Sequence, residues 1–149
     1  MALTFELKHY EQLSKDEFFE IAKLRIDVFI VEQHCPYPDL DDTDKQCFHF
    51  MMKKDGELAG YVRLIDTEDP KLKKLGRIII APPFREDRLG KTLVQQALKA
   101  TQEQYPQAQK VAISAQQIII PFYNKVGFKE EGPIYLEDRI PHRKMVYTF

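Results

Sequence analysis

The residues best suited to bind an anion lie in a charged loop, Arg85–Lys91, between an isoleucine-rich run and a long amphipathic segment. Amide groups at the start of a helix lack backbone partners and point outward with the positive end of the helix dipole, which favours a phosphate by about 0.3–1 kcal/mol. Arg85, Arg88 and Lys91 add charged donors, and Gly90 has no Cβ that would keep a phosphate from the backbone. This order of residues predicts a diphosphate site. The alternative is a solvated basic loop.

The acidic segment around residue 40 suggests calcium binding, but its spacing does not fit. Four aspartates lie close together there: Asp39, Asp41, Asp42 and Asp44. Counted from Asp39, the glycine position of a calcium loop holds Asp44 and the closing glutamate position holds Phe50. We therefore expect a solvated loop, and the alternative is a loop that attracts a cationic amine.

The two cysteines raise two possibilities, nucleophilic catalysis and a disulfide, and the sequence favours neither. Cys47 lies two residues before His49, but no third group is present to orient the pair for nucleophilic catalysis. Cys35 and Cys47 could form a disulfide, yet two cysteines in a charged chain with no export signal usually stay reduced.

Length and charge limit the remaining classes of protein. At 149 residues the chain is expected to form one domain, residues 1–149. Its 22 Lys and Arg against 23 Asp and Glu give a net charge of −1, which argues against a nucleic-acid partner. No apolar run reaches the roughly 20 residues of a membrane span, and the N-terminal residues do not resemble a secretion signal, so we expect a cytoplasmic location and no membrane partner.

Hydrophobic periodicity and turn residues define the elements that must position the loop. The expected strands are Leu3–Lys8, Phe48–Met52, Leu58–Ile65, Arg77–Ile80, Lys110–Ser114, Phe128–Glu131 and Lys144–Phe149. Asp55-Gly56 predicts a tight turn that joins the second and third strands in a hairpin. The apolar Arg77–Ile80 strand is expected to be buried on both faces.

Three helices are expected: Ser14 to about Val31, Leu89 to Tyr105, and about Ile119 to Val126. Ser14 and Glu17 have the spacing of a capping box, and Gly127 is well placed to end the third helix. The order of elements predicts an α/β (α+β) fold, in which a mixed sheet carries helices on both faces.

The strand, charged loop and second helix resemble motif A of the GNAT superfamily, the Gcn5-related N-acetyltransferases. The family pattern is Arg or Gln, two residues, Gly, one residue, then Gly or Ala. The chain has Arg85-Glu86-Asp87-Arg88-Leu89-Gly90, so both ends match and Arg88 stands where the family has its middle glycine. A non-glycine residue with a positive φ is uncommon, so the family pattern does not predict the backbone conformation of the loop at Arg88.

Further segments resemble the same superfamily. Gln116, then Phe122-Tyr123, then Gly127-Phe128 match the order and spacing of motif B. The stretches Val28–Asp42 and Tyr135–His142 are similar to the ElaA-like branch, so the resemblance extends from about Leu24 to Met145.

The resemblance implies a GNAT-like fold, a mostly antiparallel twisted sheet flanked by helices, that binds an acyl-coenzyme A. The implied cofactor-binding residues are Ile78, Ile79, Ile80, Arg85, Glu86, Asp87, Arg88, Leu89, Gly90, Lys91, Gln116, Phe122 and Tyr123. Glu32, Gln33 and His142 are implied to border the acceptor pocket, and Tyr123, His142 and Glu32 are the implied catalytic residues.

The chemistry of acyl transfer limits what these residues do. A tyrosine of pKa about 10 cannot easily protonate a thiolate whose thiol has a pKa of about 8.5, so we expect Tyr123 to donate a hydrogen bond that strengthens as charge develops on sulfur. The alternative is a packing tyrosine.

A lysine-like amine needs roughly 4.6 kcal/mol to become neutral at pH 7 and therefore requires a base or a water relay, whereas an α-amine needs only about 1.4 kcal/mol. The candidate bases are Glu32, His34, His49 and His142.

The expected activity is transfer of an acetyl group from acetyl-CoA to a primary amine by direct attack in a ternary complex, without a metal. The acceptor is expected to be a small-molecule or peptide amine, and the sequence leaves a homodimer open. The alternative is a non-catalytic acyl-CoA-binding regulatory module. Another kind of nucleotide-binding α/β protein is disfavoured because no glycine-rich run ends in Gly-Lys-Ser or Gly-Lys-Thr.

Overall fold

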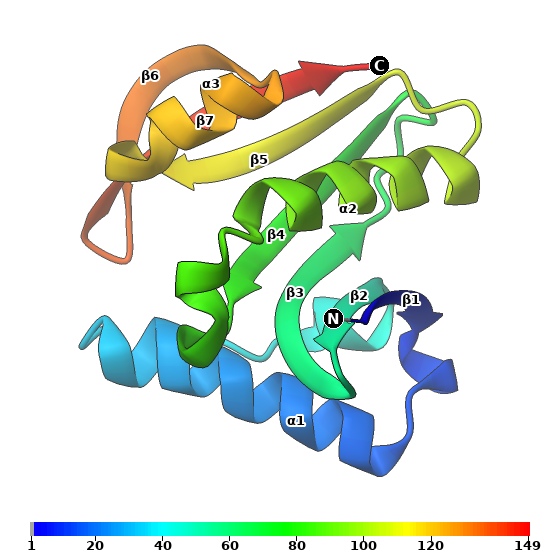
Figure 1. The fold of residues 1–149 in the computed structure, drawn as a ribbon. Helices are drawn as coiled ribbons and strands as arrows, with labels where there is room; N and C mark the ends of the chain where they lie inside the picture. Colours follow the sequence, from blue (N-terminus) through cyan, green and yellow to red (C-terminus); the bar gives the residue numbers. More distant parts are fainter. Residues whose placement is uncertain (1) are drawn as a thin grey trace.

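The computed structural model describes residues 2–149, in which seven strands form a sheet in the order β1-β2-β3-β4-β5-β7-β6 (Figure 1). Neighbouring strands are antiparallel except for β4 and β5, which are parallel. The strands are β1 Leu3–His9, β2 Phe48–Lys54, β3 Glu57–Ile65, β4 Leu72–Ile80, β5 Lys110–Gln116, β6 Lys129–Glu137 and β7 Ile140–Thr148. The predicted mixed and mostly antiparallel sheet is confirmed.

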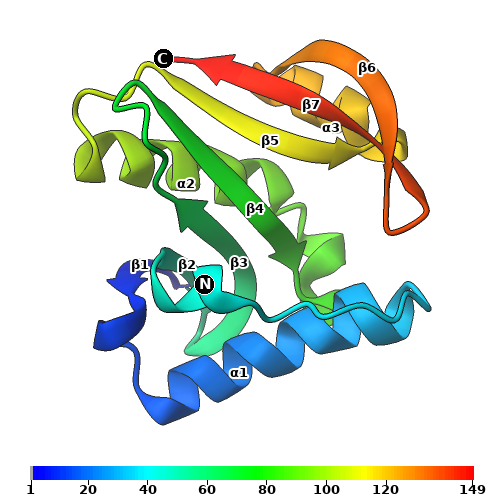
Figure 2. The same ribbon diagram turned by 180° about the vertical axis from the view of Figure 1, so that it is seen from behind.

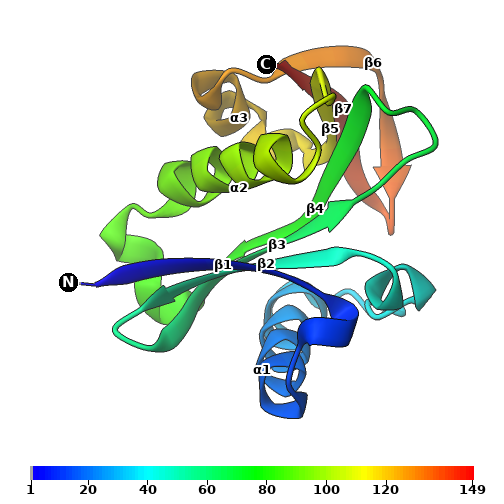
Figure 3. The same cartoon turned by 90° about the vertical axis from the view of Figure 1, so that its right-hand side faces the viewer.

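Helices cover both faces of this sheet, α1 on one side and α2 and α3 on the other (Figure 3). They are α1 Lys15–Arg25, α2 Gly90–Gln104 and α3 Ile120–Val126. Ser14 and Glu17 form the predicted capping box, with hydrogen bonds of 2.9 and 3.0 Å. After α1 the chain continues as a wider π-helical segment, η2 Ile26–Glu32. Within residues 2–149, no helix is both long enough and apolar enough to cross a membrane.

The larger part of the core lies between α2 and the sheet. Leu93, Val94, Ala97 and Leu98 are buried at the helical spacing that the sequence predicted. They pack in one cluster with residues of several strands, among them Phe50, Met52, Val62, Leu64, Leu75, Val111 and Ile113. This packing fixes the start of α2, and with it the charged loop, against the sheet.

The isoleucine-rich strand differs from the prediction in its length and its burial. β4 begins at Leu72, and of the three isoleucines only Ile79 is buried. Arg77 has a φ of 50° and lies in a bulge opposite β3. β4 pairs with β5 only at Leu72–Lys74, after which the two strands diverge (Figure 2). The predicted burial is therefore confirmed for the face with Ile79 only; Ile78 and Ile80 on the other face are partly buried, because they border the cleft left by the departure of β5.

The last two strands extend beyond their predicted bounds and form a hairpin. The turn between β6 and β7 places Asp138 at φ 50° and Arg139 at φ 68°. Neither residue is a glycine, so the sequence carried no strong turn signal there. Gly132, with φ 82°, lies in an irregularity within β6 rather than at the end of the strand. The tip of this hairpin lies beside the C-terminal ends of β4 and β5, where the two strands have diverged.

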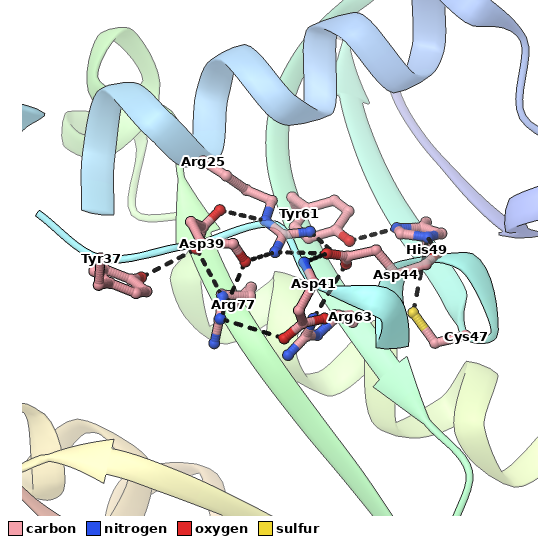
Figure 4. A network of polar contacts seen from close by, with 10 residues as sticks. All are labelled: Arg25, Tyr37, Asp39, Asp41, Asp44, Cys47, His49, Tyr61, Arg63 and Arg77. Atoms are coloured by element: carbon pink, nitrogen blue, oxygen red, sulfur yellow. Dashed lines mark hydrogen bonds and ion pairs between the residues drawn. The ribbon is translucent and has the colours of Figure 1, made fainter. Parts of the chain in front are cut away.

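The acidic loop is only partly solvated: Asp41 and Asp42 are exposed as predicted, whereas Asp39 and Asp44 are buried because they pair with arginines (Figure 4). Asp39 is 4% and Asp44 is 3% exposed. The fully buried Arg25 donates to Asp39 at 2.9 Å and to Asp44 at 2.6 Å. Arg63 lies 3.2 Å from Asp44, and Arg77 lies 2.7 Å from Asp39. These two carboxylates are already neutralised and cannot attract a cationic amine.

Candidate active site

A cleft of about 570 Å³ opens where β4 and β5 separate. Its walls are the end of η2 with the following loop, the C-terminal halves of β4 and β5, the start of α3, and the tip of the β6–β7 hairpin. The predicted site residues that line it are Glu32, Gln33, Ile78, Ile79, Ile80, Arg85, Gln116, Tyr123 and His142. Residues predicted for two different substrates therefore border the same space.

The β4 wall offers backbone groups to a ligand. Beyond Lys74, the edge of β4 that faces β5 has no strand partner among residues 2–149. The carbonyl of Ile80 accepts a hydrogen bond from Arg85 Nε at 3.2 Å, while Ile78 and Ile79 lie between it and the bulge. An extended ligand arm can pair with this free edge as a strand would.

The charged loop follows β4 as the 3-10 turn η4, Pro82–Asp87, and leads into α2. Arg88 adopts φ 56° and ψ 41°, the left-handed conformation that the family motif provides with glycine. The substitution therefore preserves the left-handed backbone conformation at this position. In the described part of the chain no side chain caps the start of α2, which leaves its first amides free for an anion.

The other predicted cofactor residues lie outside the lining of the cleft: Glu86, Asp87, Arg88, Leu89, Gly90, Lys91 and Phe122. Leu89 is 7% exposed and belongs to the core, so only its backbone can meet a ligand. Asp87 accepts an ion pair from Lys54 at 2.6 Å. Arg88 and Lys91 form no ion pair within residues 2–149 and are the free cations of the loop.

The structure gives Gly90 a packing role that the sequence did not predict. A Cβ on Gly90 would lie 3.3 Å from Cζ of Phe122, which is tight for two carbon atoms. The missing side chain thus makes room for α3 against α2, and α3 carries Tyr123.

We predict that Gly90→Val weakens CoA binding about tenfold, because the added methyl groups push Phe122 and the start of α2 apart. Gly90→Ala should give a smaller loss. Isothermal titration calorimetry with CoA measures the affinity, and urea unfolding shows how much stability each variant has lost. Unchanged affinity in both variants would separate Gly90 from the cofactor site.

Tyr123 is a buried residue that lines the cleft. The residue is 7% exposed, and its ring contacts those of Phe122 and Phe128 at centroid distances of 5.2 and 5.7 Å. Within residues 2–149 its hydroxyl has no hydrogen-bond partner. Burial raises the pKa of Tyr123 well above its ordinary value, so the phenol stays protonated and can donate a hydrogen bond to a ligand.

Glu32 and Arg85 form a bidentate ion pair across one end of the cleft. Arg85 Nη1 and Nη2 each lie 2.7 Å from a carboxylate oxygen of Glu32. The hydrogen bond from Arg85 lowers the pKa of Glu32, which weakens this carboxylate as a base. Next to the pair, Gln116 Nε2 lies 3.4 Å from Gln33 Oε1.

His142 lies on the opposite wall and is 7% exposed. Its Nδ1 is 2.7 Å from the carbonyl oxygen of Ile140, which can only accept, so Nδ1 carries a hydrogen and donates a hydrogen bond to this oxygen. Its Nε2 lies 3.3 Å from Glu137, which also lines the cleft. Among the candidate bases His142 and Glu32 line the cleft, whereas His34 and His49 do not.

His49 belongs to a buried group with Asp44 and Cys47 whose ligand atoms lie within 4.8 Å of one another. Such a group could suggest a metal. However, Asp44 already accepts hydrogen bonds from Arg25 and Arg63, and both ring nitrogens of His49 contact oxygen atoms. Buried guanidinium groups beside the carboxylate make a cation site unfavourable.

The structure adds cleft residues that the sequence reasoning missed. They are Tyr37, Arg77, Ser114, Ile118, Glu137 and Asp138, among others. Nothing in the sequence placed Arg77 in the cleft, because an arginine in a strand does not indicate the positive φ that this residue adopts. Glu137 and Asp138 could have been found only by predicting the hairpin.

Comparisons with known proteins agree with this geometry. Residues 11–149 match the family model described as an acetyltransferase (GNAT) domain. A UPF0039 protein of Schizosaccharomyces pombe is 37% identical over 96% of this chain and 95% of its own length, and protein ElaA of Escherichia coli is 32% identical over 90% and 89%. The crystal structure of an acyl-CoA N-acyltransferase from Pseudomonas aeruginosa is 33% identical, covers 99% of this chain and 100% of its own, and superposes with a TM-score of 0.90.

Proposed function

Because the chain belongs to the ElaA-like branch of the GNAT acetyltransferase family, we propose that it transfers an acetyl group from acetyl-CoA to a primary amine within the β4–β5 cleft. Members of this family are acyl-CoA-dependent acyltransferases that act on amine acceptors. The acetyl group, the primary amine and the residue roles are the proposed part.

On the donor side, the amides at the start of α2 hold the diphosphate, and Arg85, Arg88 and Lys91 add positive charge. The free edge of β4 at Ile78–Ile80 holds the pantetheine arm, since its backbone groups lack a neighbouring strand. The arm then directs the thioester toward Tyr123.

On the acceptor side, the amine enters between the wall with Glu32 and Gln33 and the wall with His142. Its nitrogen forms a bond to the thioester carbonyl carbon, and the carbon–sulfur bond breaks. The amine gives up one proton, directly or through water, to a base, for which His142 Nε2 and Glu32 are the candidates. Tyr123 donates a hydrogen bond to the sulfur as negative charge develops there.

One observation carries this proposal: Tyr123, whose hydroxyl has no hydrogen-bond partner among residues 2–149, lines the same cleft as the unpaired edge of β4. Because burial of the residue raises the pKa of the phenol and keeps it protonated, the hydroxyl is a donor that still lacks a hydrogen-bond partner among the described residues. A ligand atom in the cleft can supply that partner.

The test is release of free thiol when the protein is mixed with acetyl-CoA and a panel of primary amines, followed with a thiol-reactive chromophore. We expect amine-dependent release that saturates with acetyl-CoA, and slower release with longer acyl thioesters. Binding of CoA without release for any amine would favour the non-catalytic module. A protein that binds no CoA would refute both functions.

A further inference from the structure

The ion pair between Glu32 and Arg85 joins two residues that serve different substrates in the proposed function. Glu32 ends η2 on the acceptor wall, and Arg85 lies in the loop that precedes α2. Both amino groups of the guanidinium point at the carboxylate, each at 2.7 Å, and Nε donates to the Ile80 carbonyl. These contacts use three of the five N–H groups of Arg85, including both Nη atoms of its outer edge, and engage both carboxylate oxygens of Glu32.

A guanidinium holds one bidentate anion at a time on its outer edge. The diphosphate of CoA and the Glu32 carboxylate are therefore competitors for Arg85. The side chains of Arg85 and Glu32 are 42% and 44% exposed, and an exposed ion pair of this kind is weak enough to exchange partners.

We propose that Arg85 leaves Glu32 for the diphosphate when the acyl donor binds, and that Glu32 becomes a free carboxylate on the acceptor wall only then. This inference rests on the proposed function. It explains why both residues line the cleft and also pair with each other. The hydrogen bond from Arg85 now lowers the pKa of Glu32, so its loss makes Glu32 a better base and a stronger partner for a cationic amine.

The exchange predicts that removing the competitor strengthens donor binding. Glu32→Gln keeps the shape of the side chain but loses its charge, so CoA should bind about two- to fivefold more tightly than to the wild type. Glu20→Gln is the matched control, because Glu20 is exposed on α1, the same helical stretch, and makes no ion pair within residues 2–149. It should change the affinity by less than about 1.5-fold.

A double-mutant cycle separates competition for Arg85 from a general charge effect. In the Arg85→Ala background, Glu32→Gln should no longer strengthen CoA binding beyond the Glu20→Gln control. Calorimetric titration of CoA at one fixed ionic strength gives all the dissociation constants. Circular dichroism of each variant checks that it is folded.

The outcomes distinguish this inference from the function on which it rests. If the wild type binds CoA but Glu32→Gln binds it no better than Glu20→Gln, or if the gain persists in the Arg85→Ala background, the exchange is overturned and the proposed function stands. If the wild type binds neither CoA nor acetyl-CoA, both are overturned.

Discussion

Tyr123→Phe should lower the turnover number by about 10- to 100-fold while the affinity for CoA stays within about twofold. The hydroxyl is the only group that the substitution removes, and it lies in the cleft without a protein partner among residues 2–149. Its hydrogen bond to sulfur is strongest when the carbon–sulfur bond breaks, so its loss raises the barrier more than it weakens binding. Thiol release measures turnover, and calorimetry measures affinity.

Tyr147→Phe is the control for this prediction. Tyr147 packs against Phe128, the same ring that contacts Tyr123, but Tyr147 does not line the cleft. This variant should keep the wild-type turnover. If Tyr123→Phe also kept full activity, Tyr123 would be a packing residue, and the assignment of a hydrogen bond to sulfur would be wrong.

Arg25→Met should lower the free energy of unfolding by about 3–5 kcal/mol. The substitution leaves the carboxylates of Asp39 and Asp44 buried with only one arginine partner each. Burial by itself raises the pKa of Asp44, but the hydrogen bonds led by the one from Arg25 outweigh burial and lower it. Without Arg25 two arginines remain for three aspartates, since Arg63 also pairs with Asp41, so the largely buried network keeps one excess negative charge. Urea unfolding followed by circular dichroism measures the change.

Lys23→Met on the same helix controls for loss of a positive charge. Lys23 pairs with Asp27 at 3.0 Å, but the two side chains are 65% and 52% exposed, so we expect a change below about 0.5 kcal/mol. Equal small losses for Lys23→Met and Arg25→Met would mean that the buried network contributes little to stability.

The elements with strong local signals were predictable from the sequence. The Ser14 and Glu17 capping box, the Asp55-Gly56 turn and the stop at Gly127 each depend on residues within one turn of the chain, and all three are confirmed. Asp55 and Gly56 have φ values of 51° and 85°, as a tight hairpin turn requires. The helix after the charged loop was equally clear, because its apolar positions repeat at helical spacing.

The features that depend on distant partners were not predictable in the same way. The burial of Asp39 and Asp44 in the acidic loop was not visible, because Arg25, Arg63 and Arg77, which pair with them, come from three separate elements. The divergence of β4 from β5 is a property of the sheet, and an isoleucine run alone does not show which edge lacks a neighbour. The ion pair between Glu32 and Arg85 joins residues 53 positions apart. In each case the residue types were visible in the sequence, but their pairing required the fold.

The most direct test of the account is to follow the backbone amide signals by ¹H–¹⁵N correlation spectroscopy as CoA is added. The account predicts that the largest shifts fall on residues 88–91, where the amides meet the diphosphate, and on residues 78–80, where the strand meets the pantetheine arm. Binding that shifts other amides and leaves these two segments unchanged would contradict it.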